Sequence, residues 1–538
     1  MAEISLDLRK LKFLILLVFL IAIFYFEFSV TLSSPIAFGD EALHTNIAKW
    51  IGMRRDYPVY MPQIGTTIYK IGFFRSPLFN ILQGSFYYLF GFNDVFARFM
   101  VPFIALLTGL GVYVLVSKIY SQDVAIVASV TTMTVPSFIT YSVLLYTDVL
   151  VVLFVSITIL ATILSFKLNR RKYMFLAGMF GALSILTDAS GFTVIPFFAL
   201  VILYHLYQKR SLKSTISFMY PAAIIFALVL APFFVRNLVY YKTITCQLPG
   251  FGSSHCNMIP NPTTQYSFEG VLSSGPTSIE FFSSGILSYF SFSYGYVYFV
   301  PLFAVAGIAL SAYRRELPDI LVIIALISFF FVFYQSLPGR VEDMVRNVIA
   351  STSVVALLVG LYAGEIMSFL KKYNKQFIWA VIFFVLVVSY FNFQNRLTQL
   401  NDPNAHVTKF YTSFFDACTW AKTNLPQNSL ILSFWTAPTV YNCERPAEWD
   451  FTDSADVILS QNVTLAKQKL QENGFTHIFV QEFSLTSQKI SGGYYLGFID
   501  MLNQNPNSFK IVYQNGPDLL TCVRQGGCDG TIIYQIIY

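Results

Sequence analysis

The sequence predicts a polytopic α-helical membrane protein of about eleven transmembrane helices with a C-terminal outer α/β domain. Of its 538 residues, 55% are hydrophobic and 12% are charged, about half the charged fraction of a soluble domain. The mean hydropathy is +0.59. A soluble enzyme of this size cannot bury so much apolar surface. The 55 Phe and 33 Tyr exclude a disordered chain.

A transmembrane helix needs about 20 mostly apolar residues, and we find eleven such segments. Arg9, Lys10 and Lys12 stand at the start of the first one, as they do in signal peptides. However, its apolar run at 11–25 is long for a signal peptide and no small-residue cleavage site follows, so we expect a retained anchor. The predicted spans are residues 11–30, 97–117, 123–141, 148–166, 173–187, 191–207, 215–235, 286–310, 317–335, 345–367 and 376–393.

Lys and Arg in the short loops predict the orientation, because cytoplasmic loops carry the excess of basic residues. The connections near 146–148 and 187–191 contain neither. With the N-terminus inside, every basic cluster falls on the inner side, and eleven crossings place the C-terminus outside. The inner clusters are Lys118; Lys167, Arg170, Arg171 and Lys172; Lys209, Arg210 and Lys213; Arg314 and Arg315; Lys371, Lys372 and Lys375.

This topology divides the chain into a membrane domain at 1–393, with outer loops at 31–96 and 236–285, and an extracytoplasmic domain at 394–538. Polar outer segments on a membrane body are where substrate chemistry is expected. The net charge of +6 comes from 35 basic and 29 acidic residues. No basic stripe occurs outside the loops, which argues against a nucleic-acid partner.

All six cysteines fall on the outer side, and an even number on the oxidising side fits disulfides. Several connectivities are possible, and unpaired small apolar residues are the alternative. The close pairs Cys246/Cys256 and Cys522/Cys528 are natural partners, which leaves Cys418 with Cys443.

In the tail, helical and strand-like segments alternate, which predicts a mixed or parallel sheet. It has no nucleotide-binding glycine fingerprint. The predicted helices are 409–423, 464–472 and 494–503, and the predicted strands are 429–434, 477–480, 509–513 and 532–537.

Acidic residues at the outer face are the candidate catalytic groups. Asp40 and Glu41 follow the first span at the start of a predicted amphipathic helix, 41–53, which would hold both carboxylates at headgroup depth. Asp148 lies in a very short outer turn, and Asp188 takes the same place one hairpin later. The alternative for each is helix capping, which often uses Asp.

Basic residues of the outer loops are candidate ligands for a lipid phosphate. Lys70 and Arg75 precede an apolar run at 79–90 that is too short to span and is expected to lie along the membrane surface. Headgroup anchoring is the alternative for Arg75. Arg236, Arg340 and Arg346 are further candidates; a local ion pair with Glu342-Asp343 is the alternative for the last two.

The membrane half resembles the GT-C class of polytopic glycosyltransferases, most of all the protein O-mannosyltransferases and the lipid A aminoarabinose transferases. Relatives often have Lys-Pro-Pro where this chain has Arg75-Ser76-Pro77. The tail's Glu448-Trp449-Asp450-Phe451-Thr452 departs from the Trp-Trp-Asp-Tyr-Gly motif of oligosaccharyltransferases. The resemblance rests on the order and spacing of Asp40-Glu41, Arg75-Ser76-Pro77-Leu78, Gly91, Ala97-Arg98, Asp148 and Ala231-Pro232-Phe233-Phe234-Val235-Arg236-Asn237.

The resemblance implies a glycosyltransferase with an inverting mechanism on the outer face. Its donor would be a polyprenyl- or dolichyl-phosphate sugar, and its acceptor a hydroxyl of a protein, glycan or lipid. Asp40 would be the general base, with Glu41 or Asp148 orienting the acceptor or the base. Arg75 would be the first choice for the leaving phosphate. His44 is expected to be an interfacial or acceptor-contact residue.

We predict no cofactor and no metal site; a divalent ion has no support, because Glu41 and His44 alone do not make a metal cage. The rival function is a transporter or lipid flippase, which predicts inverted repeats and broken helices in matching halves. Prolines occur in or near spans, for example at Pro102, Pro136, Pro196 and Pro232, but no paired half-repeat is found. A structural surface protein is the third option, although eleven spans exceed what an anchor requires.

Overall fold

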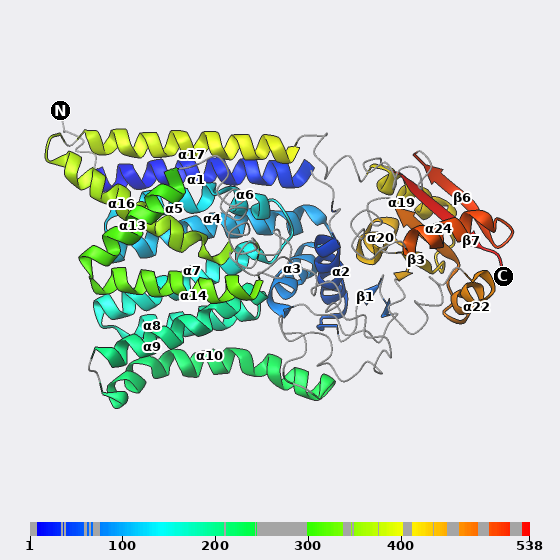
Figure 1. Cartoon of the computed structure of the whole chain (residues 1–538), viewed down its shortest axis with the longest axis horizontal. Helices are drawn as coiled ribbons and strands as arrows, with labels where there is room; N and C mark the ends of the chain where they lie inside the picture. Colours follow the sequence, from blue (N-terminus) through cyan, green and yellow to red (C-terminus); the bar gives the residue numbers. More distant parts are fainter. Residues whose placement is uncertain are drawn as a thin grey trace.

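The computed structural model places a bundle of long helices beside a smaller α/β unit, with the start of the first helix and the C-terminus at opposite ends of the molecule (Figure 1). Between these two parts lie two shorter helices, α2 and α3. The structure describes residues 8–33, 36, 39–58, 62–63, 66–67, 76–208, 211–242, 244, 299–336, 346, 349–374, 376–401, 412–433, 435–448, 462–481, 494–516 and 530–538.

Each of the eleven predicted spans contains a helix. Seven of the described helices are long and apolar enough to cross a membrane, or eight if α5 and α6 form one bent span. The chain is therefore a polytopic helical protein, and the count of eleven stays a prediction. The elements are α1 (Leu8–Ser33), α4 (Asp94–Ile119), α5 (Gln122–Thr134), α6 (Pro136–Ser142), α7 (Asp148–Leu168), α8 (Arg171–Ile185), η1 (Ala189–Thr193), α9 (Val194–Tyr207), α10 (Leu212–Tyr241), α13 (Phe299–Arg314), α14 (Leu317–Ser336), η3 (Ile349–Ser351), α16 (Thr352–Lys371) and α17 (Phe377–Asn401).

The predicted span at 123–141 is broken rather than straight. Helices α5 and α6 meet at an angle of 62°. The cause is Pro136, which disfavours helical backbone at the residue before it; Val135 has φ −66° and ψ 129° and is extended. After the break, α6 ends at Ser142, and the turn that follows leads into Asp148.

Helix α7 is the centre of the bundle and packs against α4, α8 and α14. In its apolar segment, 89% of the residues are buried. Near the start of α4, Arg98 donates to the carbonyl oxygen of Thr31 at 2.9 Å and so binds the last turn of α1. Helix ends leave carbonyls without helical partners, and a basic side chain there satisfies them.

Helices α2 (Gly39–Arg54) and α3 (Pro77–Phe90) lie at the end of the bundle that faces the α/β unit (Figure 1). They pack against each other closely because Gly84 has no side chain: a Cβ there would lie 2.7 Å from the Cβ of Ile51. The short strands β1 (Pro62–Gln63) and β2 (Thr66–Thr67) pair antiparallel between them in sequence. Helix α2 occurs where the sequence predicts a helix, and α3 covers the apolar run 79–90. Their position along a membrane surface stays a prediction.

The tail contains a five-stranded mixed sheet of order β4-β3-β5-β7-β6. Strand β3 is parallel to β4 and β5, and β7 is antiparallel to β5 and β6. Neighbouring residues of β5 enter different cores, since Ile478 and Val480 lie in one and Phe479 in the other. The elements are α19 (Thr412–Asn424), β3 (Ile431–Ser433), α20 (Thr436–Cys443), β4 (Ala447–Glu448), α22 (Val463–Glu472), β5 (His477–Gln481), α24 (Tyr494–Gln504), β6 (Phe509–Asn515) and β7 (Thr531–Ile536).

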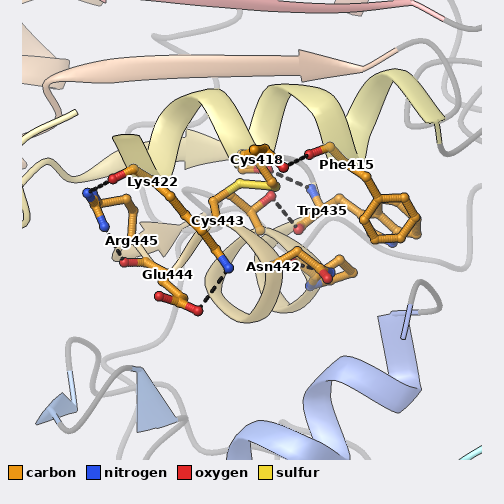
Figure 2. Close-up of a disulfide and its surroundings, with 12 residues drawn as sticks. Phe415, Cys418, Lys422, Trp435, Asn442, Cys443, Glu444 and Arg445 are labelled. Carbon is orange, nitrogen blue, oxygen red and sulfur yellow. Dashed lines mark hydrogen bonds and ion pairs between the residues drawn. A yellow bond between two sulfur atoms is a disulfide. The ribbon is translucent and has the colours of Figure 1, made fainter. Parts of the chain in front are cut away.

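A disulfide joins Cys418 of α19 to Cys443 of α20 (Figure 2). It confirms the third of the three pairs favoured from the sequence. The other four cysteines, Cys246, Cys256, Cys522 and Cys528, lie outside the described residues. Helix α20 and strand β4 were not predicted.

The contact between α8 and α10 yields a test of the bundle. A Cβ at Gly178 would lie 2.3 Å from the carbonyl oxygen of Ala222, so we expect Gly178→Ala to cost about 1–3 kcal/mol through overpacking. The matched control is Gly111→Ala, whose Cβ would meet only Leu153 at 3.8 Å. Thermal unfolding in detergent should show a lower midpoint for Gly178→Ala alone; equal midpoints would contradict this packing.

Candidate functional site

Two helix starts and one arginine come together at the end of the bundle that faces the tail. The Nη1 group of Arg346 donates to Asp40 Oδ2 at 2.9 Å, and its Nε lies 3.5 Å from Asp148 Oδ1. Asp40 stands in the first turn of α2 and Asp148 in that of α7. The positive end of each helix dipole stabilises a carboxylate in this position. The structure therefore brings together two predicted acids and one predicted cation.

This cluster is largely removed from water. Asp148 is 1% exposed, and the guanidinium carbon of Arg346 lies 4.8 Å from the ring centroid of Tyr146. Burial alone would lower the pKa of Arg346, but the carboxylates of Asp148 and Asp40 outweigh it and raise that pKa. Burial, then Asp40 and Glu41, raise the pKa of Tyr146. A permanent cation thus lies on a neutral aromatic ring.

Glu41 has a different role from Asp40 in this arrangement. It is 4% exposed, and its Oε1 accepts a hydrogen bond from the backbone N–H of Leu145 at 2.9 Å. Leu145 belongs to the turn between α6 and α7, three residues before Asp148. Glu41 therefore connects the start of α2 to the turn that positions Asp148.

Asp188 supports the same turn from the other side. Its Oδ2 accepts from the Thr147 hydroxyl at 3.0 Å, and its Oδ1 accepts from the Ser190 N–H at 3.2 Å as the cap of η1. The helix-capping alternative is therefore correct for Asp188. Thr147 was not among the predicted site residues, although its position next to Asp148 in a very short turn is a signal for it.

His44 lies between α2 and α3. It is 1% exposed, and its Nδ1 is 2.7 Å from Asn80 Oδ1. The amide of Asn80 also donates to the Tyr57 hydroxyl at 3.3 Å. Asn80 was not among the predicted site residues. An amide inside the apolar run 79–90 is nevertheless a recognisable signal, because a buried amide needs hydrogen-bond partners.

The predicted basic residues have different surroundings. Lys70, Arg75 and Arg340 lie outside the described residues. Ser76, which follows Arg75, is the N-cap residue that precedes α3. The N–H of Leu78 donates to the Leu186 carbonyl at 2.9 Å, which fixes the start of α3 to the end of α8.

The described long-range contacts of Arg236 are with the segment after α2 and not with Asp40 or Asp148. Its Nη2 donates to the carbonyls of Tyr57 at 3.2 Å and Pro58 at 3.0 Å, and its guanidinium lies 5.0 Å from the Tyr57 ring centroid. These contacts hold the segment that follows α2. Among the residues with described contacts, the cation next to the acids is Arg346.

Within the described ranges, no group of three or more His, Cys, Asp or Glu has an arrangement suited to a metal ion. The site offers instead two carboxylates, one of them partly open to solvent, and a fixed guanidinium. Such a set can accept a proton from a hydroxyl and stabilise an anion.

Comparison with known proteins assigns the fold. Residues 75–235 match the family model described as dolichyl-phosphate-mannose-protein mannosyltransferase. No curated protein matches the chain. ArnT from Cupriavidus metallidurans in the apo state is 13% identical with a TM-score of 0.65, over 96% of this chain and 97% of that one.

A second similar structure is the oligosaccharyltransferase of Archaeoglobus fulgidus in complex with Zn and sulfate. It is 14% identical with a TM-score of 0.64, over 91% of this chain and 71% of that one. Both are GT-C glycosyltransferases. The chain therefore has the GT-C fold, as the resemblance in its motifs predicted.

The ion contacts of Arg346 yield a stability test. In Arg346→Gln, Asp148 stays buried without its cation, and we expect a loss of about 2–3 kcal/mol, below the value for a fully buried pair. Adding Asp148→Asn should recover part of that loss. Lys422→Gln, which removes an exposed partner of Glu444, is the control with little expected change. A double variant less stable than Arg346→Gln would argue against the pairing.

Proposed function

We propose that this chain is a membrane glycosyltransferase that moves a hexosyl or pentosyl residue from a polyprenyl- or dolichyl-phosphate donor to an acceptor hydroxyl. The observation that carries the proposal is the position of Arg346 between Asp40 and Asp148, where three groups needed for such a transfer meet. The match of residues 75–235 to the mannosyltransferase model supports it.

The donor would bring its phosphate to Arg346. A guanidinium pairs well with phosphate oxygens through parallel N–H donors. The anion would compete with Asp40 for Arg346, and the Asp40 oxygen that accepts from Arg346 would then be open to the acceptor. Lys70 and Arg75 are proposed as further cations for the phosphate, and Arg236 as a more distant one. Solved GT-C structures support this class of ligand. One structure of ArnT is bound to undecaprenyl phosphate. One of AglB, the oligosaccharyltransferase of Archaeoglobus fulgidus, is in complex with a dolichol-phosphate and an inhibitory peptide.

The reaction would be a single inverting displacement. The acceptor oxygen forms a bond to the anomeric carbon while the bond from that carbon to the phosphate oxygen breaks. The bonding pair leaves with the polyprenyl phosphate, and the acceptor proton passes to an oxygen of Asp40. General-base assistance of this kind contributes about 10²–10⁴-fold. Arg346 stabilises the charge that develops on the leaving phosphate.

Asp148 and Glu41 are proposed to orient these groups rather than react. Asp148 is buried and lies against Arg346, so it keeps the guanidinium in place as the phosphate charge grows. Glu41 is held by the Leu145 N–H. Fixing reacting groups before the reaction removes the cost of reorganising them during it.

The active site is proposed to face the outer side, together with the tail. The basic loops predict this orientation, and the Cys418–Cys443 disulfide supports it, because such bonds persist in oxidising compartments. The acceptor would be a hydroxyl of a protein, glycan or lipid that reaches Asp40 at the end of the bundle that faces the tail.

Replacement of Asp40 tests the proposal. Asp40→Asn keeps the side-chain shape but removes the proton acceptor, so transfer should fall by about 10²-fold or more. The matched control is Asp56→Asn, an exposed acid after the same helix that accepts from Trp50. The assay supplies purified protein in detergent with a panel of lipid-phosphate sugars and no ion gradient. Full transfer by Asp40→Asn would refute the assigned base.

A further inference from the structure

Helix α20 of the tail belongs to two hydrophobic cores. Ala437 lies in the main core of the helical bundle, and Tyr441, four residues later, packs against the same core. Val440 and Cys443 lie in a core of the tail. Residues four apart share one face of a helix, so α20 presents one face to the bundle and another to the tail. It packs directly against α2.

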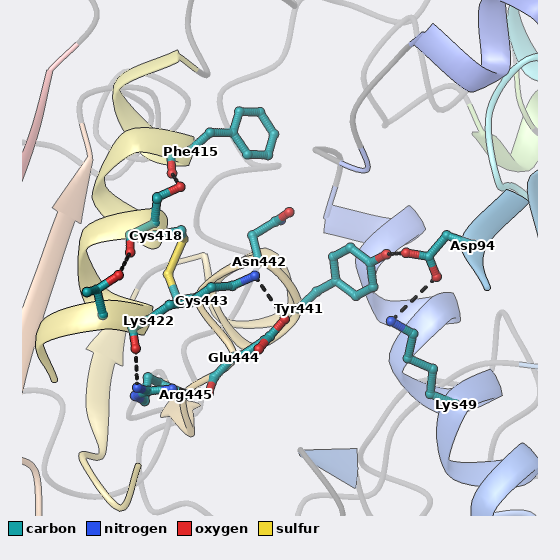
Figure 3. Close-up of polar contacts among 12 residues, drawn as sticks. Lys49, Asp94, Phe415, Cys418, Lys422, Tyr441, Asn442, Cys443, Glu444 and Arg445 are labelled. Atoms are coloured by element: carbon teal, nitrogen blue, oxygen red, sulfur yellow. Dashed lines mark hydrogen bonds and ion pairs between the residues drawn. A yellow bond between two sulfur atoms is a disulfide. The ribbon is translucent and has the colours of Figure 1, made fainter. Parts of the chain in front are cut away.

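Asp94 is the polar centre of this contact (Figure 3). Its Oδ2 accepts from the hydroxyl of Tyr441. Its Oδ1 accepts from the hydroxyl of Tyr87 at 2.8 Å. The Nζ of Lys49 lies 3.5 Å from Oδ1 and 4.4 Å from the Tyr441 ring centroid. One carboxylate thereby joins α2, α3, α4 and α20.

Both phenols of this contact stay donors at neutral pH. Burial first, and the nearby Asp94 carboxylate second, raise the pKa of Tyr87 and of Tyr441 above the ordinary value. Their hydroxyls therefore keep the protons that Asp94 needs. The hydrogen bonds to an ionised acceptor are of the stronger, charge-assisted kind.

Helix α20 also forms hydrogen bonds to the chain on both sides of Asp40 and Glu41. The amide of Asn442 donates to the Ile36 carbonyl at 3.1 Å, before α2 begins. The amide of Asn46, within α2, donates to the Ala437 carbonyl at 3.2 Å. Asp40 and Glu41 lie between these two attachments.

The tail in turn fixes α20 (Figure 2). The disulfide ties its last residue to α19. Arg445, two residues after Cys443, is 7% exposed. Its Nη2 donates to the carbonyls of Lys422 at 2.7 Å and Leu425 at 2.8 Å at the end of α19. A short helix held in this way is a rigid support for whatever packs on it.

We propose that α20 positions the catalytic end of α2, and that Tyr441, acting through Asp94 and Lys49, is a positioning residue for sugar transfer. The proposal rests on the proposed function for its kinetic part. A small shift of Asp40 relative to Arg346 would slow the reaction, since a misplacement of about 1 Å can cost about 10²-fold. The lipid phosphate would bind as before, because Arg346 is not part of this contact.

Removing one hydroxyl from the full chain is the test. In Tyr441→Phe we expect kcat to fall by about 10-fold, with KM for the lipid-phosphate sugar unchanged within about twofold. Amide hydrogen exchange at residues 39–46, measured by mass spectrometry in detergent, should become faster. Tyr538→Phe is the matched control, because its hydroxyl donates to the Phe475 carbonyl inside the tail; it should change neither quantity.

The outcomes separate the two proposals. Unchanged kcat together with unchanged exchange at 39–46 would overturn the positioning role, as would a parallel change in the Tyr538→Phe control. Faster exchange in a chain whose wild type transfers no sugar would support the α20 contact and refute the proposed function. If Tyr441→Phe fails to fold, Asn442→Ala, which loses the bond to Ile36, takes its place with the same expected results.

Discussion

The contact of Arg346 with Asp40 and Asp148 is the interaction on which the site depends. Two carboxylates at the starts of two helices would repel each other in a poorly hydrated place. A guanidinium between them removes the repulsion and lets α2 and α7 meet. Arg346 and Asp40 are 306 residues apart, so the site requires the folded bundle. The same cation is suited to the phosphate of a lipid donor, which links the assembly of the site to its proposed chemistry.

A second constraint comes from the tail. The bundle and the α/β unit share α20, whose two faces enter two different cores. The tail is therefore more than a polar appendage on a membrane body. Through Asp94 and the bonds to Ile36 and Asn46, it holds the segment that carries Asp40 and Glu41. Its proposed role in the site is to hold the start of α2 in position, in addition to any role in selecting the acceptor.

Local patterns predicted much of the fold. Apolar runs located a helix in each of the eleven predicted spans, and alternating segments located most of the tail elements. The sequence also singled out Asp40, Glu41 and Asp148, because acids are scarce where the apolar body meets its predicted outer loops. The sequence did not predict helix α20. Pro438 near its start argues against a helix, although proline is tolerated in the first turn.

Long-range pairing was beyond the sequence. The sequence proposed Arg346 as a phosphate ligand, with an ion pair to the nearby acids 342–343 as the alternative, and gave no sign that Asp40 and Asp148 lie next to it. Arg236 matches the family pattern, yet its described bonds go to the carbonyls of Tyr57 and Pro58. Charge and residue type show that a side chain can bind an anion, but only the fold shows which side chains face one another.

The most direct test of the account is an experimental structure of the chain with a polyprenyl phosphate. We expect phosphate oxygens within ion-pairing distance of Arg346, next to Asp148. We also expect the distance from Arg346 to Asp40 to exceed the 2.9 Å of the unliganded site. A phosphate bound elsewhere on the bundle, with the contact between Arg346 and Asp40 intact, would contradict it.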